Sequence, residues 1–279
     1  MMAVEAFAPA KINLTLHVTG QRNDGYHLLD SLVVFADIGD TVTVAPADQL
    51  RLMVDGPMAD GVPTDGGNLV IKASRQLSLD NNAAITLTKR LPASSGIGGG
   101  SSDAAAALRA LSELWNLPLP DRHTVLSLGA DVPVCMEART VRMSGIGEDL
   151  SAVPTIPAMD VLLVNPGVSV PTPSVFRALK NRDNPPMPAE LPHWNGAVEF
   201  CRWLKRQRND LQDPAIALEP VIADVLSTLE ESGCLHAAMS GSGATCFALF
   251  HEGEEAVEAA CRSIADEHPD WWVACGRLI

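Results

Sequence analysis

Tyrosine and long apolar runs are nearly absent from this sequence. Tyrosine occurs once among 279 residues, at Tyr26, and aromatic residues make up only 4% of the chain. The apolar runs are short, as in Val161-Leu-Leu-Val164, whereas a membrane-spanning helix needs about 18 or more consecutive apolar residues. We therefore expect no membrane span.

Closely spaced metal ligands are missing as well. The six cysteines stand singly without a C-x-x-C spacing, and the seven histidines include no H-x-x-x-H pair. Zinc sites and disulfide frameworks usually depend on such spacings, so we expect free thiols in a reducing compartment and no metal site built by the protein. The first ten residues lack a basic region followed by a continuous apolar stretch, so we expect no leader peptide and a cytoplasmic protein.

Positive charge is scarce. The chain has 20 Lys and Arg residues against 34 Asp and Glu residues, which gives a formal net charge of −14. A nucleic-acid interface needs a basic surface that displaces counterions, so we expect no nucleic-acid partner. A bound nucleotide would have to be held by local backbone dipoles, a few cations and Mg²⁺ against an unfavourable overall field.

Glycine, in contrast, is concentrated in one stretch, Leu91-Pro-Ala-Ser-Ser-Gly-Ile-Gly-Gly-Gly-Ser-Ser-Asp103, which four alanines follow. Ser101 and Ser102 are residue types that cap helices, Asp103 suits a first helical turn, and alanines propagate a helix. The pattern predicts a glycine loop that leads into a helix N-terminus, where free N–H groups and the helix dipole attract phosphate. The alternative is a glycine-rich hairpin or linker that merely precedes a helix.

Apolar periodicity predicts strands alternating with helices. We expect strands over 11–18, 31–35, 41–44, 50–54, 84–88, 159–164 and 271–275, and helices over 68–78, 121–128, 195–206, 219–232 and 254–266, besides the helix after the glycine loop and a short one from Ser174. Residues 181–192 contain four prolines and read as an exposed loop. Prolines at 154 and 157 indicate a boundary, which divides the chain into domains 1–154 and 155–279.

Several polar residues stand out, each with a structural alternative. Lys11 begins the alternating strand 11–18, and spacing alone favours a solvated lysine at the strand end. Asp131 lies among small and apolar residues, where a carboxylate must be hydrogen-bonded, paired or catalytic, and a turn or capping role is the alternative. Tyr26 and His27 end a polar loop and either contact a ligand ring or anchor the loop on the core. Gly241 and Gly243 form either a second site of close backbone approach or an ordinary bulge.

Known phosphate-binding motifs narrow the choice. The sequence contains no Gly-Lys-Ser/Thr of a Walker A loop, and the dinucleotide pattern G-x-G-x-x-G fails at its third glycine, where Ser101 stands. The stretch Pro92–Ser102 instead resembles the Pro-x-x-x-Gly-Leu-Gly-x-Gly-Ser-Ser motif of the GHMP kinase family, which includes galactokinase, homoserine kinase and mevalonate kinase. Pro9-Ala-Lys11 and Gly241-Ser-Gly-Ala244 match two further family motifs in the expected order.

Other segments resemble one branch of that family, which phosphorylates a methylerythritol linked to cytidine diphosphate in the non-mevalonate isoprenoid pathway. These segments are Pro9-Ala-Lys-Ile-Asn-Leu14, Asp24-Gly-Tyr-His27, Leu128-Gly-Ala-Asp-Val-Pro133 and Pro166-Gly-Val-Ser-Val-Pro-Thr172. One departure is Ser94-Ser95, where some relatives have two glycines; serine should still permit the loop.

The resemblance implies an α+β fold of two domains. The N-terminal domain would resemble domain 2 of ribosomal protein S5, the C-terminal domain would be a ferredoxin-like α/β sandwich, and the active site would lie in the cleft between them. ATP would be the phosphoryl donor, with Mg²⁺ bound through ATP and not directly by the protein. The partner would be a small-molecule acceptor, and the protein a monomer or a homodimer.

The resemblance also implies roles for individual residues. Asp131 would accept the proton of the acceptor hydroxyl, and Lys11 would keep Asp131 ionised and stabilise charge on the transferring phosphoryl group. The implied acceptor-binding residues are Asn13, Tyr26, His27, Thr172, Phe176 and Gly241, with Tyr26 and Phe176 sandwiching the cytosine and His27 reading its edge. The implied ATP-binding residues are Asn68, Lys89, Pro92, Ala93, Ser94, Ser95, Gly96, Ile97, Gly98, Gly99, Gly100, Ser101 and Ser102. The alternatives are another GHMP kinase, of homoserine or mevalonate type, and a non-catalytic ATP-binding sensor.

Overall fold

The computed structural model describes residues 2–253 and 255–279. The chain forms two compact units, each made of three separate stretches. Unit 1 comprises the chain up to Lys11 with Gly39–Ala93 and Gly98–Ala138, and unit 2 comprises Ile12–Ile38, Ser94–Ile97 and Arg139–Ile279. Because these units alternate along the chain, they do not test the predicted boundary between domains 1–154 and 155–279, which stays a prediction.

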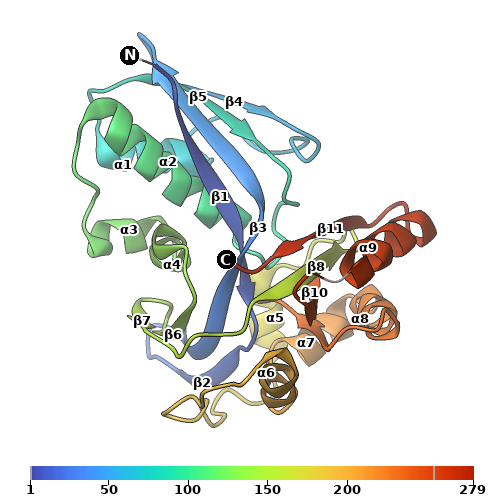
Figure 1. The fold of residues 1–279 in the computed structure, drawn as a ribbon. Helices are drawn as coiled ribbons and strands as arrows, with labels where there is room; N and C mark the ends of the chain where they lie inside the picture. The colour runs from blue at the N-terminus through green and yellow to red at the C-terminus, as the bar shows by residue number, and fades with distance from the viewer. Residues whose placement is uncertain (1, 254) are drawn as a thin grey trace. The chain divides into compact units, whose positions relative to one another are not determined.

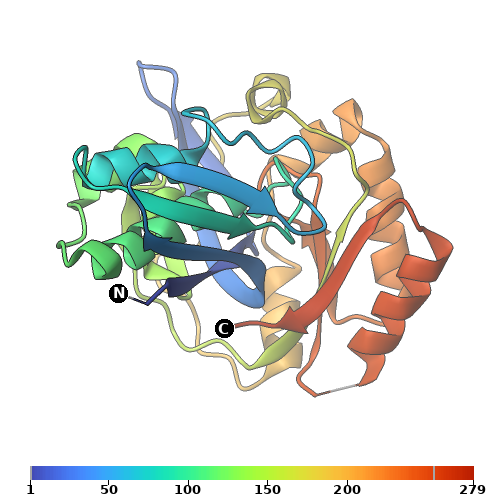
Figure 2. The same ribbon diagram turned by 90° about the horizontal axis from the view of Figure 1, so that it is seen from above.

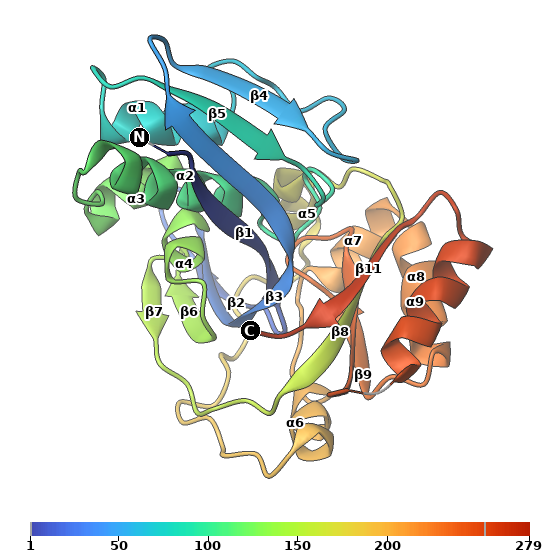
Figure 3. The ribbon, with the colours of Figure 1, turned by 45° about the horizontal axis from the view of Figure 1, so that its top comes forward.

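Unit 1 is a sheet covered by helices (Figure 1). Its elements are β1 (Val4–Asn13) up to Lys11, the second part of β3 (His27–Pro46), β4 (Arg51–Asp55), β5 (Ala83–Thr88), α1 (Leu69–Leu77), α2 (Gly99–Trp115), α3 (Arg122–Leu128) and α4 (Val132–Glu137). Strand β5 pairs antiparallel with β3 and parallel with β4. Helices α1 and α2 pack against each other on one face of the sheet, α4 packs against α2, and α3 packs against α4 and α1 (Figure 3).

The core of unit 1 explains why the alanine run follows the glycine loop. Ala106, Ala107 and Ala110 of α2 are buried in one cluster with strand residues such as Val42 and Ile85. Alanine has the highest helix propensity, and its small side chain lets the helix lie close to the sheet. The helix ends at the C-cap residue Asn116, which has a left-handed conformation with φ 52°.

Unit 2 contains a four-stranded antiparallel sheet in the order β11-β8-β10-β9. Its strands are β8 (Met159–Asn165), β9 (His236–Met239), β10 (Cys246–His251) and β11 (Trp272–Arg277). Helices α8 (Val221–Glu231) and α9 (Glu255–Glu267) cover one face of it (Figures 1 and 2). Numbered along the chain, the strand order is 4-1-3-2, which confirms the ferredoxin-like arrangement expected for the C-terminal half.

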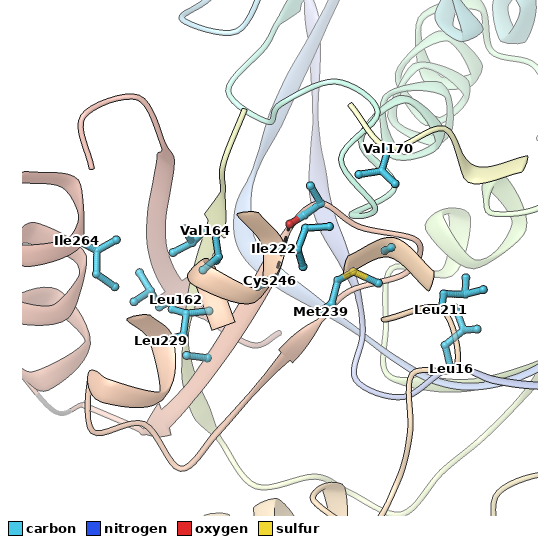
Figure 4. Packing of buried hydrophobic residues seen from close by; sticks show 14 of the residues in the cluster. Leu16, Leu162, Val164, Val170, Leu211, Ile222, Leu229, Met239, Cys246 and Ile264 are labelled. Atoms are coloured by element: carbon cyan, nitrogen blue, oxygen red, sulfur yellow. Dashed lines mark hydrogen bonds between the residues drawn. The ribbon is translucent and has the colours of Figure 1, made fainter. Parts of the chain in front are cut away.

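The other elements of unit 2 are β2 (His17–Gln21), the first part of β3, β6 (Val141–Gly145), β7 (Asp149–Ser151), α5 (Thr172–Ala178), α6 (Ala197–Leu204) and α7 (Gln212–Leu218). The main core of unit 2 joins the early segment of the chain to the late ones (Figure 4). Leu16 and Leu211 lie in the same buried cluster as Leu162, Ile222 and Met239. No helix of the described residues is both long enough and apolar enough to cross a bilayer.

The structure corrects the expected strand 11–18. Strand β1 ends at Asn13 and β2 begins at His17, so two strands stand where one continuous strand was expected. The polar face predicted to meet solvent is buried: Lys11, Asn13, Thr15 and His17 are all less than 5% exposed. These polar groups have partners instead of water, as where Asn13 Nδ2 donates to Ser31 Oγ over 2.7 Å.

Two short helices escaped the sequence analysis. Helix α4 lies in the apolar run that contains Asp131, and α7 follows the predicted helix 195–206. Helices of six or seven residues have too few turns for a periodic apolar pattern to be recognised. The last predicted helix is α9, which begins at Glu255; residue 254, where the prediction began, lies outside the described part of the chain.

Candidate active site

The N-terminus of α2 is open toward the glycine loop. Its N-cap is Gly98 in a left-handed conformation (φ 65°), and no side chain of the described residues caps it. The prediction that Ser101 and Ser102 cap the helix is therefore wrong, since both lie inside it, and Ser102 Oγ donates to the Pro9 carbonyl over 2.8 Å. Asp103 lies beyond the first turn. The first backbone N–H groups of α2 have no intrahelical acceptor, which suits the binding of an anion.

Two loop glycines are required by close contacts, each within one unit. A Cβ at Gly98 would lie 3.1 Å from Lys11 Cβ, and φ is +65° there. A Cβ at Gly96 would lie 2.6 Å from the Ser240 carbonyl oxygen, closer than real contacts allow. Ser94 also has a positive φ of 52°. The departure from glycine at 94 thus falls on a backbone conformation that glycine adopts more easily.

Lys11 and Asp131 form an ion pair in unit 1. Lys11 Nζ lies 2.7 Å from Asp131 Oδ2, and the Lys11 side chain is 5% exposed whereas that of Asp131 is 35% exposed. The solvated strand-end alternative for Lys11 is therefore wrong. Asp131 stands at the N-cap position of α4 but makes no capping hydrogen bond with its side chain, which contradicts the capping alternative. Its carboxylate is open to a second donor.

The turn before Asp131 lies against the start of α2. A Cβ at Gly129 would be 4.0 Å from Ser101 Oγ, and Gly98 touches Lys11 as described above. The structure therefore brings the Lys11–Asp131 pair and the open helix N-terminus together within unit 1. In the next turn, burial raises the pKa of the Cys135 thiol, with a smaller contribution from the Asp131 charge, so Cys135 stays a neutral thiol.

Asn68 and Lys89, two of the residues expected to bind ATP, have partners within the protein. Asn68 is the N-cap of α1: its Oδ1 accepts from Val70 N over 2.8 Å and its Nδ2 donates to the Pro63 carbonyl over 2.7 Å. Lys89 is buried, and its ammonium contacts Asp40 and Asp103. A contact of either residue with ATP stays a prediction.

In unit 2, Asn13 and the loop share one serine. Ser240 Oγ accepts from Asn13 N over 3.1 Å and donates to the Gly96 carbonyl over 3.0 Å. Asn13 Oδ1 is buried without a partner among the described residues, and a Cβ at Gly241 would lie 3.4 Å from it. A buried acceptor without a donor is costly, so this oxygen is suited to accept a hydrogen bond from a ligand.

Of the three rings expected to contact cytosine, those of His27 and Phe176 lie together, and that of Tyr26 is exposed. His27 stacks on Phe176 with a centroid separation of 4.6 Å and an angle of 22°. His27 Nε2 is buried without a partner among the described residues, and burial, followed by the Arg182 charge, lowers the pKa of His27. Tyr26 is 59% exposed, so its alternative as an anchor on the core is wrong. Thr172 contributes a hydroxyl 2.7 Å from that of Ser242.

Metal binding by the protein itself has no support in the described part of the chain, where no three His, Cys, Asp or Glu side chains gather in a way that would hold an ion. The open amides of α2 suit phosphate oxygens, which are themselves ligands that Mg²⁺ prefers. The site therefore fits a metal that is bound by the phosphates of a nucleotide and not by protein side chains.

Sequence reasoning missed three buried polar residues beside the predicted ones: Asp40, Asp103 and Ser240. A usable signal existed for Asp103, because a carboxylate that precedes four alanines stands in the same kind of small, apolar surroundings that drew attention to Asp131. Asp40 and Ser240 show no such signal, since their contacts join residues about 50 and more than 140 positions apart.

Comparison with known proteins adds independent information. The family model described as the GHMP kinases N-terminal domain matches residues 68–141, and that described as GHMP kinases C terminal matches 194–268. A protein of Ruegeria pomeroyi, named 4-diphosphocytidyl-2-C-methyl-D-erythritol kinase, is 58% identical over 279 residues, covering 100% of both chains. A protein of the same name from Cereibacter sphaeroides is 59% identical over 277 residues, covering 99% of each. A crystal structure of 4-(cytidine 5'-diphospho)-2C-methyl-D-erythritol kinase aligns with a TM-score of 0.79 at 31% identity, covering 98% of each chain.

Proposed function

Because the chain belongs to the GHMP kinase family, we propose that it transfers the γ-phosphoryl group of ATP to the 2-hydroxyl of 4-diphosphocytidyl-2-C-methyl-D-erythritol. The products are the 2-phosphate and ADP, and the reaction belongs to the non-mevalonate route to isoprenoid precursors. The full-length relatives at 58% and 59% identity, both named as kinases of this compound, support this substrate.

The observation that carries the proposal is the Lys11–Asp131 pair beside the open N-terminus of α2. Asp131 accepts the proton as the acceptor hydroxyl attacks the γ-phosphorus. The Lys11 ammonium, 2.7 Å from that carboxylate, stabilises negative charge on the attacking oxygen and the phosphoryl group. The amides at the start of α2 hold the donor phosphates. Phosphoryl transfer depends mainly on positioning and electrostatics, so these groups suffice.

Residues of unit 2 select the acceptor. His27 and Phe176 offer a stacked pair of rings, and the unpartnered His27 Nε2 is suited to hydrogen-bond the edge of cytosine. Tyr26, exposed in the preceding loop, closes on the other face of the base. The free Asn13 Oδ1 accepts from an acceptor hydroxyl, and Thr172 and Gly241 line the same site.

Mg²⁺ carried by ATP would neutralise part of the phosphate charge, and the open amides of α2 would hold the phosphate oxygens. The enzyme works in the cytoplasm as a monomer or a homodimer.

The decisive test is Asp131→Asn. We expect kcat to fall by about two to four orders of magnitude, the range for loss of a general base, while binding of an ATP analogue and the Tm are retained. Asp149→Asn, in an exposed strand, is the matched control. Unchanged turnover in Asp131→Asn would contradict the assigned role, and absence of turnover in the unsubstituted enzyme would indicate an ATP-binding sensor.

Assaying homoserine and mevalonate beside the cytidylyl substrate tests the identity of the acceptor. Phosphorylation of homoserine or mevalonate without phosphorylation of the cytidylyl substrate would overturn the proposed acceptor.

A further inference from the structure

A buried cluster of three ionisable side chains in unit 1 has no part in the proposed chemistry. Lys89 follows β5, Asp40 lies in β3 and Asp103 in α2, and all three are less than 5% exposed. The Lys89 ammonium contacts Asp40 Oδ2 and lies 2.9 Å from Asp103 Oδ2. Three elements therefore meet at one ammonium group.

Asp40 also fixes the chain where it enters the glycine loop. Its Oδ1 accepts from the backbone N–H groups of Arg90, over 2.5 Å, and Leu91, over 2.9 Å. These are the last residues before the loop that begins at Pro92. The Lys89 backbone is held from a third side, since its N–H donates to the Asp55 carbonyl over 2.7 Å. The entry to the loop is thus fixed by hydrogen bonds from three of its backbone N–H groups.

Asp103 fixes the chain where it leaves the loop. It lies in α2 shortly after Ser102, and its link to Lys89 ties the start of the helix to the loop entry. A Cβ at Gly99 would lie 3.5 Å from Lys89 Nζ, so the ammonium also lies close to the first turn of α2. Both ends of the loop are therefore bound to one lysine.

Burying these three ionisable groups opposes folding, so the cluster is not explained by core packing. Two carboxyl groups share one ammonium, and Asp103 Oδ1 is buried without a partner among the described residues. Burying a charge is unfavourable, and apolar residues of similar volume often stabilise a core as well or better. Packing alone does not explain why these three residues stand here, whereas their contacts with both loop ends do.

We propose that Lys89, Asp40 and Asp103 form a clamp that holds the entry and exit of the glycine-rich loop, residues 92–102, at one spacing and thereby sets the affinity of the enzyme for the nucleotide donor. The identity of that donor as ATP rests on the proposed function. On this proposal Lys89 is a positioning residue, which acts through the loop and does not touch the nucleotide.

The clamp and direct contact of the Lys89 ammonium with the nucleotide predict opposite changes in the affinity for ATP. If the Lys89 ammonium binds the nucleotide, removing a competing carboxylate frees that ammonium, and ATP should bind more tightly. If the clamp operates, removing either carboxylate releases one end of the loop, and ATP should bind more weakly. Asp40→Ala and Asp103→Ala therefore give opposite outcomes under the two hypotheses.

The experiment is calorimetric titration of the full-length chain with a non-hydrolysable ATP analogue. We expect Asp40→Ala and Asp103→Ala each to raise Kd by about tenfold, and the double variant to lose less than the product of the two, because neighbours in one network are not additive. Asp40→Asn keeps a side-chain oxygen that can accept from Arg90 N and Leu91 N, so its Kd should lie between those of Asp40→Ala and the unsubstituted chain. It is the milder variant to use if alanine prevents folding.

Asp30→Ala is the matched control. Asp30 is also a buried carboxylate that pairs with an arginine, Arg142, over 2.7 Å and accepts a backbone N–H, that of Met187, over 2.7 Å, but it belongs to unit 2. We expect it to lower the Tm comparably while leaving the Kd of the analogue unchanged.

Tighter or unchanged binding of the ATP analogue by the Asp40 and Asp103 variants would overturn the clamp. An equal loss of affinity for the analogue in Asp30→Ala would overturn it as well. Because no acceptor is present in this titration, its result does not depend on the acceptor assigned above. Failure to phosphorylate the cytidylyl substrate would overturn the proposed function and leave the clamp standing.

Discussion

Asp103 has its pKa displaced far from the ordinary range of an aspartate. Burial raises that pKa from 3.8 to about 7; the Lys89 charge opposes the rise, and Asp40 adds to it. The groups that face Asp103 are Lys89 after β5, Asp40 on β3 and, across the helix interface, the Cys135 thiol on α4. Folding therefore costs free energy whenever this carboxyl must ionise.

This shift predicts a dependence of stability on pH. In the unfolded chain the carboxyl loses its proton near pH 4, whereas in the folded chain it keeps the proton up to about pH 7. Between those values the folded state binds more protons than the unfolded state. The free energy of unfolding therefore falls as the pH rises from about 4 to 7 and does not change further above pH 7.

Asp103→Asn cannot titrate and should lack this contribution. We expect the Tm of the variant minus that of the unsubstituted chain to increase from pH 5 to 7 and then to level off. Differential scanning calorimetry at half-unit steps measures it, with Asp30→Asn treated in the same way as control. A difference that does not change with pH would show that Asp103 ionises in its ordinary range.

The Lys11–Asp131 pair illustrates what single residues reveal in a sequence. Asp131 attracted attention because carboxylates are rare among small and apolar neighbours, but its partner is 120 positions away. Periodicity predicted a solvated Lys11, since alternation describes a strand with one wet face and does not reveal what covers the other. The pairing of these two residues came from the family resemblance alone.

At the scale of elements, the glycine loop and α2 were predictable because their signals are local. Glycines, small residues and alanines act within a few positions of one another. The prediction of serine caps was wrong because Gly98, in a left-handed conformation, is the N-cap of α2. Lys11, distant in the sequence, lies close to this glycine, and no local pattern shows that contact. Strand β3 was predicted in two pieces, and its continuity over 20 residues reflects pairing with strands distant in the chain.

Gly98 provides a test of the loop as an element. In Gly98→Ala the new Cβ meets Lys11 Cβ at 3.1 Å and the residue must keep a φ of +65°, which costs about 1–2 kcal/mol for an alanine. We expect the variant to lose several degrees of Tm and about tenfold in ATP affinity, as the loop shifts to relieve the contact.

Gly66→Ala is its control. Gly66 belongs to the same unit, and a Cβ there would meet nothing within 4 Å. Its Tm should rise by about 1–4 °C, because an alanine without strain or contacts stabilises a chain by about 0.4–1 kcal/mol through the unfolded state. If both variants behave alike, the left-handed Gly98 is not needed by the loop.

For the whole molecule, the dominant electrostatic fact is the net charge of −14. The donor phosphates bind at local dipoles and cations, yet they must approach through the field of an acidic protein. Salt screens this long-range repulsion, since the Debye length shrinks from about 30 Å at 0.01 M to about 10 Å at 0.1 M.

We therefore expect the association rate of a fluorescent ATP analogue to rise roughly two- to fivefold between 10 and 150 mM NaCl, the reverse of the usual behaviour of phosphate-binding proteins. Stopped-flow measurement at constant free Mg²⁺ tests this, with a fluorescent adenosine lacking phosphates as the uncharged reference. A rate that falls with salt would mean that the local positive field of the loop extends far enough to guide the nucleotide.

The alternation of the two units along the chain has a consequence for biosynthesis. When a ribosome has passed residue 138, every stretch of unit 1 has been made, and that unit can fold. Leu16 and Val18 have also been made by then, but the buried residues that surround them come from positions 162–264. Until more than a hundred further residues have been made, the nascent chain carries a complete unit 1 together with apolar residues, Leu16 and Val18, that have no cover. Such exposed apolar surface makes partly synthesised proteins prone to aggregation and to binding by chaperones.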